Sequence, residues 1–169
     1  MLRFETAIGT CGVEWDDAGL TGVHLPGDRS LRHARDGDSA AVPAFVADAV
    51  AAMTRLLAGQ PETLADVPVS AAGPDAFARR VFAATRAVGP GETTTYGEIA
   101  RGLGDPGLAR AVGAALGANP TPIVVPCHRV LAADGSLHGF SAPGGIGTKR
   151  RMLEIEGVPG FTQQPLFAA

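Results

Sequence analysis

The N-terminal part of the chain alternates short apolar runs with tight turns. Residues 2–8, 11–15 and 20–25 read as strands. Gly9-Thr10 separates the first two runs and Asp16-Asp17-Ala18-Gly19 the last two, and such residues favour tight turns. The pattern predicts a small antiparallel meander.

A helix is predicted after this meander and a charged, glycine-containing connection over 26–41. Its apolar residues recur at helical spacing, at Val46, Val50, Met53 and Leu57, and a glycine and a proline then end it. This stripe predicts a helix that covers one sheet face. Residues 67–74 are mostly small or proline, which indicates a boundary. We therefore predict an N-terminal α/β domain over 1–73 and a mainly α-helical C-terminal domain over 74–169.

The second half reads as a series of short helices. The first has an apolar stripe of Phe77, Val81, Phe82 and Val88. Thr95 and Glu98 then fit a capping box, in which each side chain bonds the other residue's amide. Asp105-Pro106 is an N-cap followed by proline at the first helical position. Two short helices joined by a glycine-containing turn are typical of a helix-turn-helix.

The helix expected over 106–117 has one face with almost no side chains. Leu108, Val112, Ala115 and Leu116 share the apolar face, and Arg110, Gly113, Ala114 and Gly117 lie opposite. Each glycine costs about 1 kcal/mol relative to alanine, so a compensating contact is expected. Spacing alone favours close packing against another helix. The solitary arginine in a helix-turn-helix favours a helix laid against a nucleic-acid backbone.

Two elements are predicted after this helix. Asp134-Gly135 indicates a hairpin within 129–140, which after a helix-turn-helix would be a wing. A last helix carries basic residues early and an apolar inner face late, with Glu156 at its end. These residues are Lys149, Arg150, Arg151, Met152, Leu153 and Ile155.

Composition narrows the class of protein. The 169 residues are 46% hydrophobic, which excludes a disordered chain, and no apolar run approaches the ~20 residues that span a bilayer. The N-terminal run lacks a signal peptide's apolar core, so we expect a cytoplasmic protein. The two cysteines are far apart, and no paired Cys or His spacing indicates a metal site. Net charge is −3, with acidic residues concentrated in the first half and arginines in the second.

Cys127 is the candidate nucleophile. It follows an apolar run and stands between Pro126 and the basic pair His128-Arg129. A reactive cysteine needs nearby positive charge or hydrogen-bond donors, whereas most free cysteines are packed small hydrophobes. The segment alone leaves both interpretations open.

Five motifs of the second half, in order over 77–157, resemble those of the O6-alkylguanine-DNA alkyltransferases. These DNA-repair proteins move an alkyl group from guanine O6 onto their own cysteine. Residues 126–130 resemble the active-site motif, 109–113 the recognition helix and 119–123 the asparagine-containing turn. Residues 94–100 and 149–157 supply the other two motifs.

The resemblance implies a role for each residue of the site. Cys127 would accept the alkyl group, His128 would take the thiol proton through a water and be oriented by Glu156, and Asn119 would brace the bend before Cys127. Tyr96 would bind or rotate the phosphate 3′ to the target, and Arg110 would fill the gap left by the extruded base. The implied DNA-contacting set is Thr95, Tyr96, Arg110, Ala111, Gly113, Ala114 and Arg129, and the implied base pocket is Pro122, Val130, Phe140 and Ser141.

The resemblance also implies a fold, an activity and a binding partner for this chain. A ribonuclease H-like N-terminal domain would precede a winged-helix domain. The activity would be that of a single-turnover methylated-DNA-[protein]-cysteine S-methyltransferase that flips its target base through the minor groove. The partner would be double-stranded DNA with O6-alkylguanine, and we expect a monomer that has no metal, no cofactor and no membrane association. Activity on O4-alkylthymine stays open.

Two departures from the family pattern affect expected contacts. Phe140 stands where many relatives carry tyrosine, so a phenol hydrogen bond to guanine is absent. Gly117 follows Leu116 where relatives often have arginine, which removes one phosphate contact. With an acidic pI near 5.7, we expect modest, salt-sensitive DNA affinity.

Three other functions compete with this interpretation. A Cys-His thiol hydrolase would use Cys127 and His128 but leaves the small-residue helix face unexplained. A noncatalytic sensor of alkylated guanine would carry another residue in place of Cys127. A winged-helix regulator would use Cys127 only as core filling.

Overall fold

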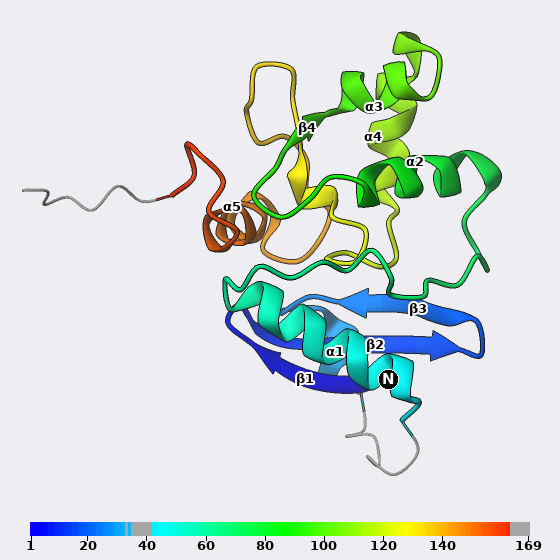
Figure 1. The fold of residues 1–169 in the computed structure, drawn as a ribbon, viewed down its shortest axis with the longest axis vertical. Helices are drawn as coiled ribbons and strands as arrows, with labels where there is room; N and C mark the ends of the chain where they lie inside the picture. Colours follow the sequence, from blue (N-terminus) through cyan, green and yellow to red (C-terminus); the bar gives the residue numbers. More distant parts are fainter. Residues whose placement is uncertain (33, 35–41, 163–169) are drawn as a thin grey trace, which may run out of the picture.

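The computed structural model describes residues 1–32, 34 and 42–162 (Figure 1). Strands β1 (Leu2–Thr6), β2 (Gly9–Asp16) and β3 (Gly19–His24) form an antiparallel sheet in that order. The predicted meander is confirmed, with strand ends shifted by up to two residues. The predicted connection over 26–41 lies partly outside the described residues, and its described part contains the short helix η1 (Arg29–Arg32).

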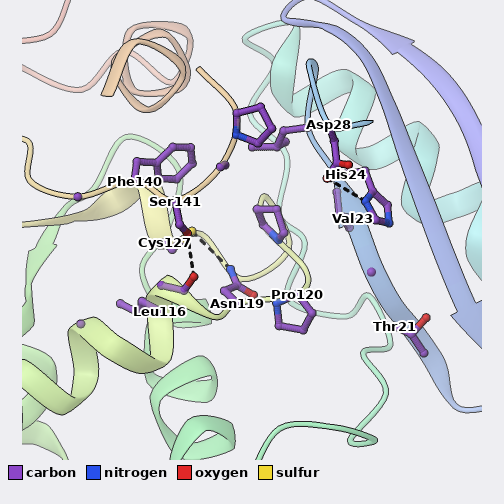
Figure 2. A pocket seen from close by; sticks show the side chains of 18 of the residues that line it. Thr21, Val23, His24, Asp28, Leu116, Asn119, Pro120, Cys127, Phe140 and Ser141 are labelled. Atoms are coloured by element: carbon purple, nitrogen blue, oxygen red, sulfur yellow. Dashed lines mark hydrogen bonds and ion pairs between the residues drawn. The ribbon is translucent and has the colours of Figure 1, made fainter. Parts of the chain in front are cut away.

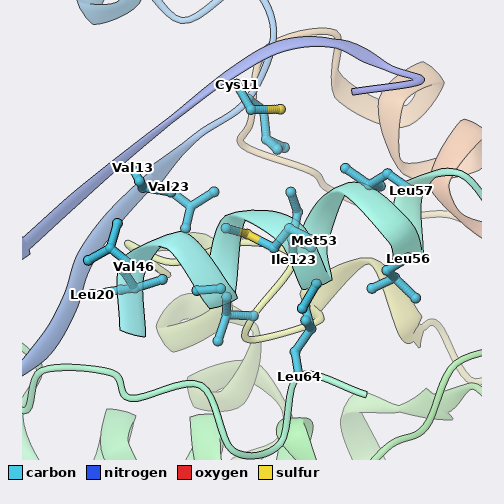
Figure 3. Packing of buried hydrophobic residues seen from close by; sticks show 14 of the residues in the cluster. Cys11, Val13, Leu20, Val23, Val46, Met53, Leu56, Leu57, Leu64 and Ile123 are labelled. Carbon is cyan, nitrogen blue, oxygen red and sulfur yellow. The ribbon is translucent and has the colours of Figure 1, made fainter. Parts of the chain in front are cut away.

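Helix α1 (Ala44–Leu57) packs on this sheet, as its apolar stripe predicts (Figures 1 and 3). Val46 and Met53 of the stripe are fully buried. The same core takes in Ile123, Val124 and Met152 from the second half of the chain. The core of the sheet therefore includes residues of the second half, which also has a core cluster of its own, so the sheet helps to fix the segment that leads to Cys127.

The second half is built of short helices, shown together above the sheet in Figure 1. Their bounds are α2 (Ala76–Arg86), α3 (Tyr96–Gly102), η3 (Pro106–Leu108), α4 (Ala109–Gly117), η4 (Cys127–Arg129) and α5 (Gly145–Ile155). The capping box at the start of α3 is present: Thr95 Oγ1 accepts from the Glu98 amide at 3.1 Å, and Glu98 Oε2 accepts from the Thr95 amide at 2.7 Å. Asp105 caps η3 through the amide of Gly107.

The predicted hairpin over 129–140 is only partly formed. The turn at Asp134-Gly135 is present, and the Ala132 amide donates to the Ser136 carbonyl at 3.1 Å. Strand β5 (Val130–Leu131) pairs instead in parallel with β4 (Thr94–Thr95), and residues 137–140 form no strand. Gly139 has φ +45°, outside the extended region, so the backbone is not extended at this residue.

The linker between the halves, over residues 64–74, is held by backbone hydrogen bonds to β3 and by hydrogen bonds from the Arg86 side chain. The Leu20 amide donates to the Pro68 carbonyl and the Ser70 amide to the Leu20 carbonyl, both at 2.9 Å, so the linker extends the edge of the sheet. Arg86 Nη2 donates to three linker carbonyls, those of Leu64, Ala65 and Val67, at 3.0, 2.7 and 2.7 Å. This guanidinium fixes the path of the linker against α2.

We predict that Arg86→Leu lowers the free energy of unfolding by about 1–3 kcal/mol, because the linker carbonyls lose their donor. Urea unfolding at neutral pH measures this. Arg55→Leu is the matched control: Arg55 is half exposed and pairs with Glu62, and such exposed pairs contribute less than about 1 kcal/mol. Equal losses in the two variants would contradict the assigned role of Arg86.

Candidate functional site

The loop between α4 and η4 places Cys127, and Asn119 organises it. Asn119 Nδ2 donates to the Val125 carbonyl at 2.9 Å and to Cys127 Sγ at 3.4 Å, while Oδ1 accepts from the Thr121 amide at 3.0 Å. One amide thus fixes both ends of the bend and contacts the sulfur. Within this bend Ile123 has φ +75°, a conformation that a β-branched residue adopts only when its surroundings impose it.

Cys127 lies at the wall of a cavity of about 390 Å³ (Figure 2). Of the predicted base-pocket residues, Pro122, Phe140 and Ser141 line this cavity. Tyr96, Gly113 and Asn119 line it too. A cysteine that is not fully buried and lines a shaped cavity favours the nucleophile interpretation of Cys127.

Val130 was predicted in the base pocket and is not found there. It is fully buried, its amide donates to the Cys127 carbonyl, and its carbonyl accepts from Lys149 Nζ at 2.6 Å. Both main-chain groups are therefore already engaged within the protein.

The thiol of Cys127 is not activated at rest. Burial raises its pKa above the ordinary 9.0, while the hydrogen bond from Asn119 and the positive charge of Lys149 oppose that rise. The thiol is accordingly protonated at neutral pH, and a reaction at sulfur needs a proton acceptor in the site.

His128 and Glu156 form a buried pair behind Cys127. His128 Nε2 lies 2.8 Å from Glu156 Oε1, and the two side chains are 0% and 2% exposed. Burial lowers the pKa of His128, against the opposing effect of Glu156. His128 Nδ1 is buried and has no hydrogen-bond partner among the described residues, and the His128 ring makes no hydrogen bond to Cys127.

Arg129 was predicted among the DNA-binding residues, and its placement contradicts that role. It is 5% exposed, and its Nε and Nη2 atoms donate to Glu156 at 2.8 Å each. Nη1 donates to the Val88 carbonyl at 2.6 Å. The guanidinium is turned inward because the buried carboxylate of Glu156 needs a compensating charge.

Lys149 is a site residue that sequence reasoning missed. Its side chain is fully buried, with Nζ 6.0 Å from the centre of the Tyr96 ring. Burial lowers its pKa, and the negative charge of a Cys127 thiolate would raise it. A usable signal existed: Lys149 stands three and four residues before the inward-facing Met152 and Leu153, so all three share a helix face. Grouping it with Arg150 and Arg151 as the basic residues early in the helix concealed this.

The small-residue face of α4 is present as predicted. Arg110, Ala111, Ala114 and Gly117 are exposed, whereas Val112 and Leu116 are buried. Gly113 lies beside Tyr96, whose ring would be 3.8 Å from an added Cβ. A long cation therefore stands on an exposed surface of small residues, on the helix whose Gly113 and Gly117 line the cavity.

The hydroxyl groups expected to meet substrate are engaged in this structure. Thr95 Oγ1 is used by the capping box. Tyr96 Oη donates to the His138 carbonyl at 3.4 Å, and Ser141 Oγ to the Gly117 carbonyl at 2.8 Å. These two bonds attach the loop over 138–141 to the start of α3 and the end of α4.

Neither a metal cluster nor a membrane span is found in the described part of the chain. No group of three or more His, Cys, Asp or Glu side chains there is arranged to hold a metal ion. None of the helices described is long and apolar enough to cross a membrane. Cys11 lies in the sheet core, where burial raises its pKa to about 11.

The buried carboxylate gives a pH-dependent prediction. Burial alone would raise the pKa of Glu156, but hydrogen bonds from His128 and Arg129 outweigh it and lower the pKa from 4.5 to about 2. Folding thus favours the ionised form, so this contribution to stability is complete above about pH 5 and is lost as pH falls toward 2. Glu156→Gln should cost about 3 kcal/mol or more at pH 7, and this difference from the wild type should shrink between pH 5 and pH 3.

Urea unfolding of both proteins across that pH range measures the effect. Glu154→Gln, on the same helix and paired with Arg151 at 3.7 Å, is the control, with an expected loss below about 1 kcal/mol. A difference between wild type and Glu156→Gln that stays constant down to pH 3 would argue against the depressed pKa.

Comparisons with known proteins agree with this geometry. Residues 76–158 match the family model described as 6-O-methylguanine DNA methyltransferase, DNA binding domain. A Mycobacterium tuberculosis methylated-DNA-protein-cysteine methyltransferase is 52% identical over 91 residues, and this match covers 54% of the chain and only about half (53%) of that relative. A Mycolicibacterium paratuberculosis protein with the same name is 40% identical over 159 residues, covering 92% of this chain and 93% of the relative.

Solved structures extend the likeness to the whole fold. The M. tuberculosis O6-methylguanine methyltransferase superposes with a TM-score of 0.75 at 35% identity, covering 98% of this chain and 94% of that one. The M. tuberculosis protein in complex with DNA gives 0.73 at 35% identity, covering 94% of each chain. With a relative matched over nearly its full length, the chain belongs to the methylated-DNA-protein-cysteine methyltransferase family.

Proposed function

We propose that this protein repairs DNA by transferring the alkyl group of O6-alkylguanine to Cys127, once per molecule. The observation that carries the proposal is the position of the Cys127 sulfur: it faces a base-sized cavity, the Glu156–His128 pair lies behind it, and the open face of α4 lies beside it. In the reaction the thiolate attacks the alkyl carbon, a C–S bond forms, and the C–O6 bond breaks with its electron pair left on guanine. The product thioether is stable, so the acceptor is used only once.

The His128–Glu156 pair supplies the proton acceptor. Glu156 is ionised and can only accept, so His128 Nε2 must carry the ring proton that it donates to the carboxylate. Neutral His128 therefore has its lone pair on Nδ1, the buried nitrogen without a partner. A water between Nδ1 and Sγ would carry the thiol proton to His128, and the departing guanine would take a proton back.

Lys149 and Asn119 stabilise the thiolate once it forms. Asn119 Nδ2 already donates to Sγ, and the positive charge of Lys149 opposes the rise in the pKa of Cys127. Both act without moving, because Lys149 is buried and Asn119 is fixed by Val125 and Thr121. Preorganised donors of this kind favour developing negative charge at little reorganisation cost.

Double-stranded DNA would lie against α4. Ala111, Gly113 and Ala114 leave its backbone open to a duplex entered through the minor groove, and Arg110 would fill the gap left by the extruded guanine. Thr95 contributes by capping α3 and so fixing Tyr96 as the first residue of that helix. Pro122, Phe140 and Ser141 would contact the flipped base in the cavity.

The finer architecture is part of the proposal. Residues 1–73 would form a ribonuclease H-like domain and 74–169 a winged-helix domain, with the turn at Asp134-Gly135 as a reduced wing. The helix-turn-helix order of α3 and α4 and the sheet with α1 support this division. A monomer in the cytoplasm, without metal or cofactor, stays the prediction made from the sequence.

Intact-protein mass spectrometry after incubation with a duplex containing O6-methylguanine tests the transfer. We expect a gain of one methyl group per molecule, located on Cys127 by peptide mapping. Cys127→Ser should gain nothing, whereas Cys11→Ala should react fully because Cys11 is buried and its pKa is raised to about 11. Native protein that binds the duplex but gains no mass would leave only a damage-binding function.

Arg110→Ala should slow repair of the duplex at least about tenfold and leave reaction with free O6-benzylguanine nearly unchanged. Only the duplex requires a base to leave the stack, which costs a few kcal/mol. Single-turnover labelling rates on the two substrates give the comparison. A similar loss on both would remove Arg110 from the extrusion step.

A further inference from the structure

The cavity that contains Cys127 reaches across to the N-terminal sheet. Its near wall carries Cys127, Phe140 and Ser141, and its far wall carries Glu14 of β2, His24 of β3 and Asp28. Figure 2 shows Cys127 and Asn119 on one side of the pocket and His24 and Asp28 on the other. A volume of about 390 Å³ lies within the range of cavities that hold drug-sized ligands, roughly 300–1,000 Å³. The cavity thus offers room beyond what a methyl group needs.

Hydrogen bonds determine which ring nitrogen of His24 carries a proton. The Ser30 hydroxyl donates to Asp28 Oδ1 at 2.6 Å, so its oxygen can only accept from His24 Nδ1, at 3.0 Å. Asp28 Oδ2, 3.2 Å from the same nitrogen, is also an acceptor, because the hydrogen bonds from Ser30 lower the pKa of Asp28 and keep it ionised. His24 Nδ1 therefore carries a proton.

The other ring nitrogen lies near Glu14. Among the described residues His24 Nε2 is buried without a hydrogen-bond partner, and Glu14 Oε2 lies 3.4 Å from it. Glu14 and Asp28 both line the cavity on this side. Their carboxylates accept hydrogen bonds and attract positive charge, so the far wall favours a donor or a cation.

We propose that Glu14, His24 and Asp28 select among O6-substituents, favouring those whose far end carries a hydrogen-bond donor or a positive charge. The inference rests on the proposed alkyl transfer and names its preferred substrate class. Methyl adducts would be too short to reach the wall and would not be distinguished by it. A para-substituted benzyl group would extend toward it, and a carboxylate in that position would meet two carboxylates.

Three free bases test the wall: O6-benzylguanines with a para aminomethyl, methyl or carboxylate substituent. Labelling rates of Cys127, followed by mass, should be about threefold to fivefold higher for aminomethyl than for methyl, the range of a half-exposed ion pair. The carboxylate should be slower than methyl. In Glu14→Gln the aminomethyl-to-methyl ratio should fall toward one. This ratio is read within each variant, so any general change in reactivity cancels.

Glu5→Gln is the matched control, since Glu5 is an exposed carboxylate of the same sheet outside the cavity. It should keep the wild-type ratio, and 0.5 M salt should reduce that ratio by screening. A wild-type ratio of one, or a ratio unchanged by Glu14→Gln, would overturn the selectivity while leaving alkyl transfer intact. Failure of all three bases and of the methylated duplex to label Cys127 would instead reject the transfer reaction, and the selectivity with it.

Discussion

The buried carboxylate of Glu156 is the constraint on which the rest of the site depends. A charge that is 2% exposed is tolerated only when it is paired and fully hydrogen-bonded, and here His128 and Arg129 supply three contacts of 2.8 Å. Both partners follow Cys127 directly, so pairing them with the end of α5 fixes η4 in space. Arg129 extends the link to the Val88 carbonyl. One carboxylate thereby joins the segment before β4, the cysteine segment and the last helix, and the orientation of His128 follows from it.

This arrangement explains how the Cys127 thiol stays protonated while a proton acceptor lies nearby. A permanently ionised Cys127 would need exposed positive charge beside it, yet Arg129 points away to Glu156 and Lys149 is desolvated. The sulfur stays protonated because of its burial, and in the proposed reaction the lone pair of His128 takes its proton. The proposed acceptor, which would react only once, would gain from such a design, since a free thiolate would be consumed by oxidants and unrelated electrophiles.

Much of this could be read from the sequence, because it follows from local rules. Short apolar runs between turn residues predicted the meander, periodicity predicted α1 and α2, and the capping box at Thr95 and Glu98 located α3. The contacts that were misassigned are long-range. Nothing local distinguishes an arginine that meets phosphate from one that neutralises a carboxylate 27 residues away, as Arg129 does. Val130 was placed in the pocket by analogy, whereas its carbonyl is taken by Lys149 from α5. The pairing of β5 is also long-range: its partner is β4, distant in sequence, rather than the second strand of a hairpin.

The shared core explains why the N-terminal sheet matters to a site whose chemistry lies in the second half. Ile123 holds a left-handed conformation four residues before Cys127, which costs of order 1–3 kcal/mol. Its side chain is 1% exposed and packs with Val124 into the core of the sheet and α1, so burial offsets the strain. The Val23 amide donates to the Pro120 carbonyl at 2.9 Å and ties β3 to the start of the same bend. The sheet that braces the bend also lines the cavity, so its side chains belong to the wall that a substrate would meet in the proposed reaction.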